Sequence, residues 1–206
     1  ILPTRRIEAG AKKYPLVEAQ QDFSNINFLY RDTLRTLDAF MKETKVVGLI
    51  IIRNDSILYE KYREGTGPQT KWVNFSVTKS VTSLLYGAAL QDGHIQSLDQ
   101  SVTWFFPELT GSAYDSVSLR ILLQMSSGVG WNDDPRNAES DLMKIGRIEK
   151  EKGWKGIVEY LSKLKRVASP GEKFNYNTVE TGLAAFILKK AIRKPLAEYI
   201  SEKIWK

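Results

Sequence analysis

Apolar residues recur at helical spacing over residues 24–44, and this spacing predicts a helix. The next apolar positions form a continuous β-branched run at 46–52, and a second run follows at 57–62. Asn54 and Asp55, which lie between the two runs, favour tight turns. The two runs therefore predict a β-hairpin, and the first strand is apolar enough to be covered on both faces.

The rest of the chain favours helices. Residues 77–89 are apolar almost all round, which predicts a buried helix. Further helices are predicted at 119–125, 140–150, 154–166, about 178–191, and after Pro195. Strands followed by many helices predict a mixed α/β chain.

Composition and charge narrow the possible functions. Of 206 residues, 42% are hydrophobic, so the chain can bury a sizeable core. The formal charge of +6 is mild, and basic residues alternate with glutamates over 144–173 without aromatic interleaving, which argues against nucleic-acid binding. Cysteine is absent, and the single histidine, His94, follows the apolar helix in a turn. These absences exclude thiol catalysis and argue against a zinc site or a Ser-His-Asp triad.

A serine and a lysine stand one helical turn apart at the start of the apolar helix. Ser76 and Lys79 share a face at this spacing, and the helix N-terminus favours negative charge. A buried lysine beside a serine is suited to accept its proton. The alternative is a helix N-cap with a solvent-reaching lysine. Ser162 and Lys165 have the same spacing inside an amphipathic helix, so the spacing alone is a weak signal.

A tyrosine forms the second candidate. Tyr176 ends an extended run after the turn at 169–171 and stands where a helix begins. In this position its hydroxyl can face another group in a cleft. A tyrosine packed at a strand end, with its hydroxyl in water, is the alternative.

Three segments in order resemble the serine β-lactamase-related hydrolases. They are SVTK at 76–79, LLQMSSGVGWNDD at 122–134 and PGEKFNY at 170–176. The resemblance covers about residues 45–206 and points to the class C β-lactamase-like carboxylesterases, the 6-aminohexanoate-dimer hydrolases and the related DD-peptidases. It implies a β-lactamase/transpeptidase-like fold, in which an antiparallel sheet is flanked by helices and joined to a helical region.

The resemblance also implies roles for individual residues. Ser76 is expected to be the nucleophile that forms an acyl-enzyme, while Lys79 and Tyr176 share the general-base and general-acid work. The Ser76 backbone N–H is expected to be one oxyanion donor. Trp131, Asn132 and Thr178 are the expected substrate-binding residues, with the loop around Trp131 forming one wall of the cleft. No metal and no cofactor are implied.

The chain departs from the family pattern in two places. The family often carries Tyr-x-Asn, in which the asparagine helps to hold a substrate amide, but the third position here is Thr178. This change favours an ester or linear amide over a β-lactam. No Lys-Thr-Gly or His-x-Gly box follows Tyr176, so the C-terminal strands, with the other oxyanion donor, are expected in a missing C-terminal part of the same polypeptide. On its own, the chain is expected to be poorly active.

Residues 1–22 are expected to be an N-terminal leader, and residues 23–206 the N-terminal and helical part of a single β-lactamase-like domain. The apolar run at 46–52 is too short to span a bilayer. The expected partners are a small ester or amide substrate and the missing C-terminal part. The chain starts with Ile1, so its location is open between the bacterial cytoplasm and periplasm, with an exported precursor as an alternative.

Three functions compete on these observations. The first is a serine hydrolase of the esterase or linear-amide type that acts through Ser76. The second is a penicillin-binding DD-peptidase or β-lactamase of the same fold. The third is a non-catalytic binding protein that retains the fold with an incomplete site. The expected absence of the C-terminal box favours the third, and the intact set of Ser76, Lys79 and Tyr176 opposes it.

Overall fold

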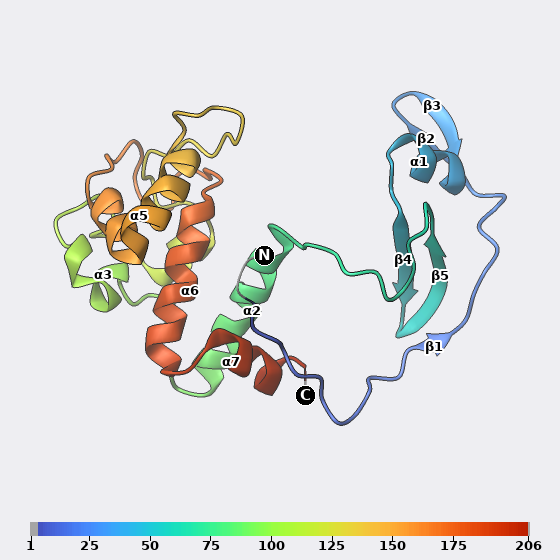
Figure 1. Cartoon of the computed structure of the whole chain (residues 1–206), viewed down its shortest axis with the longest axis horizontal. Helices are drawn as coiled ribbons and strands as arrows, with labels where there is room; N and C mark the ends of the chain where they lie inside the picture. Colours follow the sequence, from blue (N-terminus) through green and yellow to red (C-terminus); the bar gives the residue numbers. More distant parts are fainter. Residues whose placement is uncertain (1–3, 206) are drawn as a thin grey trace. The chain divides into compact units, whose positions relative to one another are not determined.

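The computed structural model describes residues 4–205. Within that range the chain forms two compact units, which are residues 11–74 and residues 4–10 together with 75–205 (Figure 1). The smaller unit contains the strands, and the larger unit contains most of the helices. No helix in the described range combines the length and apolarity needed to cross a membrane.

The smaller unit contains the predicted hairpin. Strands β4 (Gly48–Arg53) and β5 (Ser56–Tyr62) pair antiparallel, and β1 (Val17–Glu18) pairs parallel with β5. Asn54 and Asp55 form the turn with φ values of 49° and 57°, a conformation that asparagine and aspartate adopt more readily than most residues. The hairpin prediction is therefore confirmed.

The predicted covering of the first strand on both faces is not seen in the described residues. Ile50 and Ile52 of β4 remain 47% and 46% exposed. Residues 1–22 were expected to be an N-terminal leader, but Val17 and Glu18 within this range join the sheet next to β5.

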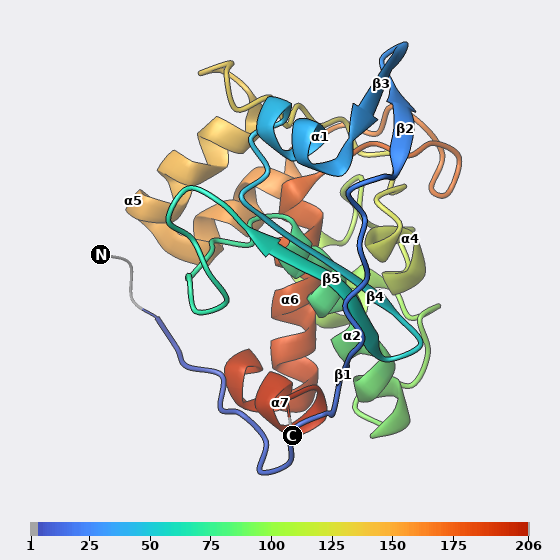
Figure 2. The ribbon, with the colours of Figure 1, turned by 90° about the vertical axis from the view of Figure 1, so that its right-hand side faces the viewer.

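The prediction of a long helix over residues 24–44 is wrong. This stretch instead forms three elements: β2 (Asn27–Tyr30), β3 (Thr33–Thr36) and α1 (Leu37–Glu43). Arg31 and Asp32 both have positive φ and turn the chain into a hairpin, which Figure 2 shows beside α1. The rings of Phe28 and Tyr30 then pack edge-on against Phe40. The hairpin is therefore stabilised by aromatic contacts that the helical spacing of the aliphatic residues does not reveal.

The larger unit is helical. Its elements are α2 (Val77–Gln91), α3 (Val102–Phe105), the 3₁₀ turn η1 (Pro107–Leu109), α4 (Leu119–Leu123), α5 (Asp141–Ser162), α6 (Thr178–Ile192) and α7 (Leu196–Lys203). The helices predicted from sequence are confirmed to within a few residues. α5 contains the two predicted helices, which meet at a break where Gly153 has φ of 59° and ψ of −157°.

Helices α2 and α6 pack together and form the frame of the larger unit. Leu85 and Ala89 of α2 and Leu183 of α6 are at most 2% exposed, and the Tyr86 hydroxyl donates to the Ala184 carbonyl oxygen at 2.8 Å. Burial of these apolar side chains is the main source of stability for this pair. The pairing brings the element that begins after Ser76 next to the element that begins after Tyr176.

The start of α2 is not buried as predicted. Val77 is 65% exposed and Leu84 is 63% exposed, so only one face of the helix enters the core. An apolar helix surface therefore remains uncovered within the larger unit.

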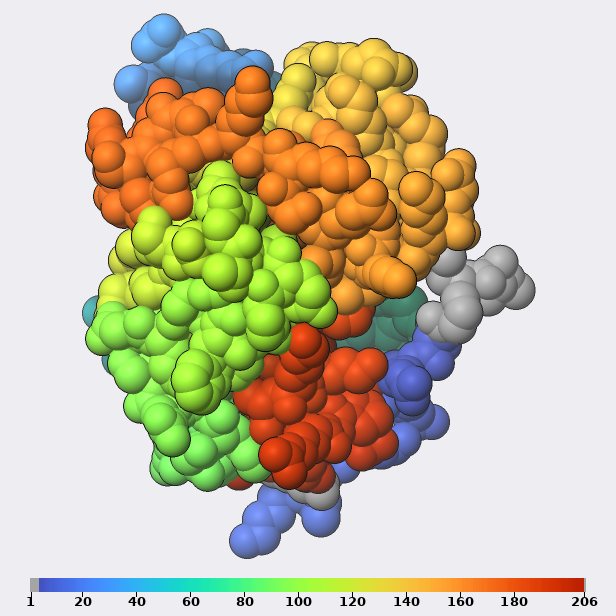
Figure 3. All heavy atoms as spheres, turned by 90° about the vertical axis from the view of Figure 1, so that its left-hand side faces the viewer, coloured from blue at the N-terminus to red at the C-terminus, as the bar shows by residue number. Residues whose placement is uncertain are grey.

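A second feature of the larger unit is an apolar hollow of about 630 Å³ between η1, α5 and α6. Figure 3 shows this face, where the lime, orange and red segments of the chain meet. Trp154, which follows the α5 break, stacks on Phe186 with ring centroids 3.7 Å apart, and the Lys190 ammonium lies 3.8 Å from the Phe106 ring centroid. The break in α5 thus directs an aromatic side chain into the core beside α6.

Candidate active site

The candidate nucleophile stands at the bend that starts α2. Phe75 has a φ of +38°, a strained conformation for a bulky side chain, and Ser76 follows at the N-cap position. The Ser76 side chain makes no capping hydrogen bond to the helix. A serine that only caps a helix normally accepts a backbone N–H, so this geometry argues against the N-cap alternative.

The Ser76 hydroxyl contacts both predicted partners. Lys79 Nζ donates to Ser76 Oγ at 3.0 Å, and the Tyr176 hydroxyl donates to the same oxygen at 2.7 Å. The lysine comes from the first turn of α2, whereas Tyr176 lies 100 residues further along the chain. The structure therefore brings together all three residues that were predicted to be catalytic.

Electrostatics at this cluster lower the pKa of the tyrosine. The Ser76 and Lys79 hydrogen bonds hold the pKa of Tyr176 below the usual tyrosine value, although partial desolvation acts against them. The Lys79 ammonium also lies 5.1 Å from the centroid of the Tyr176 ring. Lys79 is only half-buried, so the deep burial predicted for this lysine is wrong within the described residues. The N-terminal end of α2, where Ser76 and Lys79 lie, is open to solvent.

The segment that carries Tyr176 is held against the loop at 125–131. Asn175 N–H donates to the Met125 carbonyl at 2.8 Å, and Gly171 N–H donates to the Ser126 carbonyl at 2.7 Å. Gly128 has a φ of 74° and packs directly against the backbone of Ala168. These backbone contacts fix the path of the chain into Tyr176.

The three residues predicted to bind substrate lie around the start of α6 and the loop before α5. Trp131 Nε1 donates to Asp133 Oδ1 at 2.6 Å, and the Thr178 hydroxyl donates to Asp133 Oδ2 at 2.9 Å. Asn132 N–H donates to Asp141 Oδ2 at 2.7 Å. Their roles as substrate contacts stay predictions, since the indole N–H of Trp131 and the hydroxyl of Thr178 are both engaged with Asp133.

Two acidic residues at this end of α6 were missed by sequence reasoning. Asp133 lies within the WNDD segment, but nothing in that segment reveals that its partners are an indole and a threonine 45 residues away. Glu180 lies one turn into α6, is 1% exposed, and burial raises its pKa to about 7. A glutamate at a position surrounded by Val179 and Leu183 was the available signal for a buried acid.

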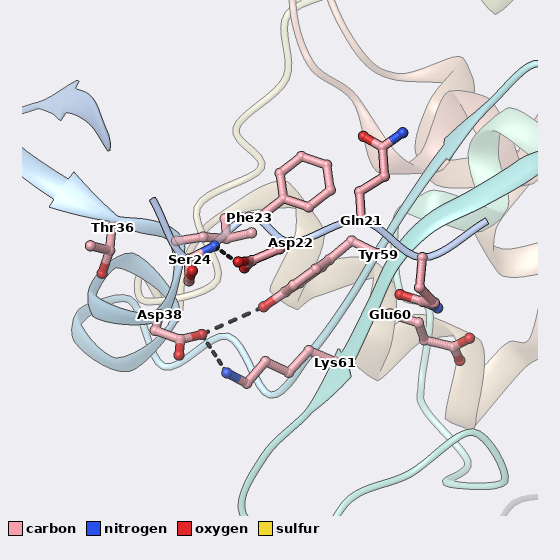
Figure 4. Close-up of a pocket in the computed structure, with 11 residues that line it drawn as sticks. Gln21, Asp22, Phe23, Ser24, Thr36, Asp38, Tyr59, Glu60 and Lys61 are labelled. Carbon is pink, nitrogen blue, oxygen red and sulfur yellow. Dashed lines mark hydrogen bonds and ion pairs between the residues drawn. The ribbon is translucent and has the colours of Figure 1, made fainter. Parts of the chain in front are cut away.

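Other candidates have ordinary surroundings. His94 is exposed in the turn after α2, as predicted. The Ser162 hydroxyl donates to the Glu159 carbonyl within its own helix at 2.8 Å. A hollow of about 320 Å³ in the smaller unit contains Tyr59, Asp38 and Lys61, with Lys61 Nζ 2.5 Å from Asp38 Oδ1 (Figure 4). No predicted site residue lines that hollow.

The strand hairpin, the helical region and the Ser76 cluster together match the architecture expected of the serine β-lactamase-related family. The chain belongs to the beta-lactamase family, whose model matches residues 34–206. The resemblance predicted from the three ordered motifs is therefore confirmed.

One sequence relative and two solved structures are similar to this chain. The 6-aminohexanoate-dimer hydrolase of Paenarthrobacter ureafaciens is 28% identical over 180 residues, which are 84% of this chain and 45% of that protein. A Bacillus anthracis structure assigned as a 6-aminohexanoate-dimer hydrolase aligns with a TM-score of 0.76 at 20% identity, covering 94% of this chain and 52% of the other. A class C beta-lactamase aligns with a TM-score of 0.58 at 23% identity, covering 82% and 45%. The chain thus spans about half the length of these relatives.

Proposed function

We propose that this chain carries the nucleophile and the acid–base groups of a serine hydrolase that cleaves an ester or a linear amide through an acyl-enzyme on Ser76. The observation that carries the proposal is the double contact of Ser76 Oγ, 3.0 Å from Lys79 Nζ and 2.7 Å from the Tyr176 hydroxyl. A serine is a weak nucleophile at its ordinary pKa, and an adjacent base is what activates it.

The proposed proton path uses this geometry. For the attack Tyr176, whose pKa is lowered, acts as the phenolate beside the Lys79 ammonium; it accepts the Ser76 proton as the oxygen bonds to the carbonyl carbon and becomes a neutral phenol. The same proton is then delivered to the leaving oxygen or nitrogen. Water attacks the acyl-enzyme by the reverse route and returns Ser76 to its resting state. The Ser76 backbone N–H is the proposed oxyanion donor from this chain.

The start of α6 favours the ester or linear-amide substrate over a β-lactam. Thr178 stands where a Tyr-x-Asn motif would place an amide, and its hydroxyl donates to Asp133. The neighbouring Asn177 is 1% exposed and its Oδ1 accepts from Val179 and Glu180 N–H, so that side chain caps the helix. The 6-aminohexanoate-dimer hydrolase relationship supports the linear-amide choice.

Intact-mass measurement of the full protein after incubation with a fluorophosphonate tests the proposal. The expected result is one adduct per chain, lost in Ser76→Ala and retained in Ser162→Ala, which removes the serine of the second S-x-x-K sequence. A parallel incubation with a penicillin separates the alternatives, since a long-lived penicilloyl adduct would favour the DD-peptidase or β-lactamase function. Absence of any adduct on Ser76 would favour a non-catalytic binding protein.

The acid–base roles give a further prediction. Lys79→Ala and Tyr176→Phe are each expected to lower ester turnover by about a hundredfold or more, because each removes a partner in proton transfer. Steady-state turnover of a chromogenic ester checks this, with circular dichroism to confirm folding. A near-normal rate in either variant removes that residue from the proposed mechanism.

A further inference from the structure

A single carboxylate connects the loop at 131–134 to the start of α6. Asp133 Oδ1 accepts from Trp131 Nε1 at 2.6 Å and from Thr178 N–H at 2.9 Å, and its Oδ2 accepts from the Thr178 hydroxyl at 2.9 Å. Three donors on one half-buried carboxylate form charge-assisted hydrogen bonds, which are shorter and stronger than neutral ones.

These contacts complete the N-terminus of α6. The first N–H groups of a helix have no intrahelical partner, and the helix dipole favours negative charge beside them. Asn177 Oδ1 accepts from Val179 and Glu180 N–H, and Asp133 supplies the acceptor for the Thr178 N–H that Asn177 leaves over. The first turn of α6 is thus fixed by one residue from its own chain segment and one from the loop.

Tyr176 lies between two attachments to the same loop. On its N-terminal side, Asn175 Nδ2 donates to the Trp131 carbonyl at 3.3 Å. On its C-terminal side, Thr178 is held by Asp133. Tyr176 itself is 38% exposed, so packing covers its side chain only in part. The position of its hydroxyl on Ser76 therefore also depends on how firmly the flanking backbone is held.

We infer that Asp133 is a positioning residue that locks the Trp131 loop to the first turn of α6 and thereby holds the Tyr176 hydroxyl on Ser76 Oγ. The inference rests on the proposed function for its consequence in catalysis, since Asp133 acts through Tyr176 and does not touch the reacting atoms. Loss of positioning of about 1 Å at a reacting group costs on the order of a hundredfold in rate.

The experiment compares Asp133→Ala with Asp134→Ala in the full protein. Asp134 is the next residue, and its carboxylate bonds to Arg136 in the same loop, so its removal matches the loss of charge without touching α6. Two quantities are measured for each variant. The first is the rate of fluorophosphonate adduct formation on Ser76, and the second is the pKa of Tyr176 from an NMR titration of ¹³C-labelled tyrosine, with Tyr176→Phe to assign the signal.

Asp133→Ala is expected to slow adduct formation by about 10- to 100-fold and to raise the Tyr176 pKa toward the ordinary tyrosine value, because the phenol moves away from Ser76 and Lys79. Asp134→Ala is expected to change neither quantity. A merely structural role would lower the melting temperature of Asp133→Ala without moving the tyrosine pKa at temperatures where the protein is folded.

Milder variants keep the inference testable if Asp133→Ala does not fold. Asp133→Asn keeps an acceptor oxygen and the shape of the side chain, and Thr178→Val removes only the hydroxyl contact. Each is expected to raise the Tyr176 pKa by a smaller amount. Because the two side chains share one contact, the double variant Asp133→Asn/Thr178→Val is expected to raise this pKa by less than the sum of the two single effects.

The two proposals fail in different ways. A wild-type protein that forms no adduct on Ser76, but whose Tyr176 pKa rises in the Asp133 variants, would refute the hydrolase and leave the positioning role in place. A wild-type protein that reacts at Ser76, with folded Asp133 variants that match it within twofold in rate and show an unchanged tyrosine pKa, would overturn the positioning role alone.

Discussion

The buried Glu180 leads to a prediction about the pH dependence of stability. Its side chain is 1% exposed, and neither carboxyl oxygen has a hydrogen-bond partner among the described residues. Burial raises the pKa of Glu180 to about 7, although the nearby hydroxyls of Ser127 and Tyr114 act in the opposite direction. Replacement by glutamine keeps the shape of the side chain and removes the titration.

The magnitude follows from the two pKa values. The carboxyl loses its proton near 4.5 in the unfolded chain and near pH 7 in the folded chain. Between these values the unfolded state binds fewer protons, so the free energy of unfolding falls as the pH rises and stays lower above pH 7. At about 1.4 kcal/mol per unit of pKa, the loss is about 3 kcal/mol. The free energy of unfolding of Glu180→Gln should not show this loss.

Urea denaturation of wild type and Glu180→Gln at a series of pH values from about 4 to 8 measures this difference. The stability of the variant relative to wild type is expected to rise by about 3 kcal/mol across that range. Glu159→Gln is the matched control, because Lys163 holds the pKa of the exposed Glu159 below its usual value and its replacement removes no raised titration. If the free energies of unfolding of Glu180→Gln and wild type differ by the same amount at about pH 4 and about pH 8, the reasoning is refuted.

Three further substitutions test the packing and surface energetics. Gly128→Ala should lower the free energy of unfolding by more than about 2 kcal/mol, since φ is +74° and a Cβ would lie 2.0 Å from the Ala168 carbonyl oxygen. Leu183→Ala, at a fully buried position, should cost about 2–5 kcal/mol. Lys61→Met should cost less than about 1 kcal/mol, because its ion pair with Asp38 is solvent-exposed. Denaturant unfolding measures all three free energies of unfolding. A larger loss for Lys61→Met than for Gly128→Ala or Leu183→Ala would contradict these assignments.

The helical part of the fold was predictable because its signals are local. α6 begins after Asn177, whose side chain caps the helix, and its apolar positions recur on the face that packs against α2. The stretch at 24–44 was mispredicted because its aliphatic residues have helical spacing, while the decisive features are two positive φ values at Arg31 and Asp32. Arginine and aspartate predict a turn with positive φ less clearly than glycine does.

The candidate site was only partly predictable for a related reason. Ser76 and Lys79 lie on one helical turn, so their contact follows from periodicity. Tyr176 comes from a segment 100 residues away, and its place in the site was expected from family resemblance and not from spacing. Asp133 acts through a hydrogen bond to a threonine 45 residues away, which a single sequence does not display. The three candidate catalytic residues were thus easier to predict than Asp133, the residue proposed to position Tyr176.

The two S-x-x-K sequences differ in the hydrogen bonds that their serine hydroxyls make. Ser162 ends α5, where its hydroxyl donates to the Glu159 carbonyl, and the carboxylate of Glu159 pairs with Lys163. The Ser162 hydroxyl is thus satisfied within its own helix. Ser76 instead precedes its helix after a strained residue and leaves its hydroxyl free of capping, so the oxygen accepts from a lysine on one side and a distant tyrosine on the other. The proposed chemistry at Ser76 therefore depends on a tyrosine that the packing of α2 against α6 brings to it, and Ser162 has no such partner among the described residues.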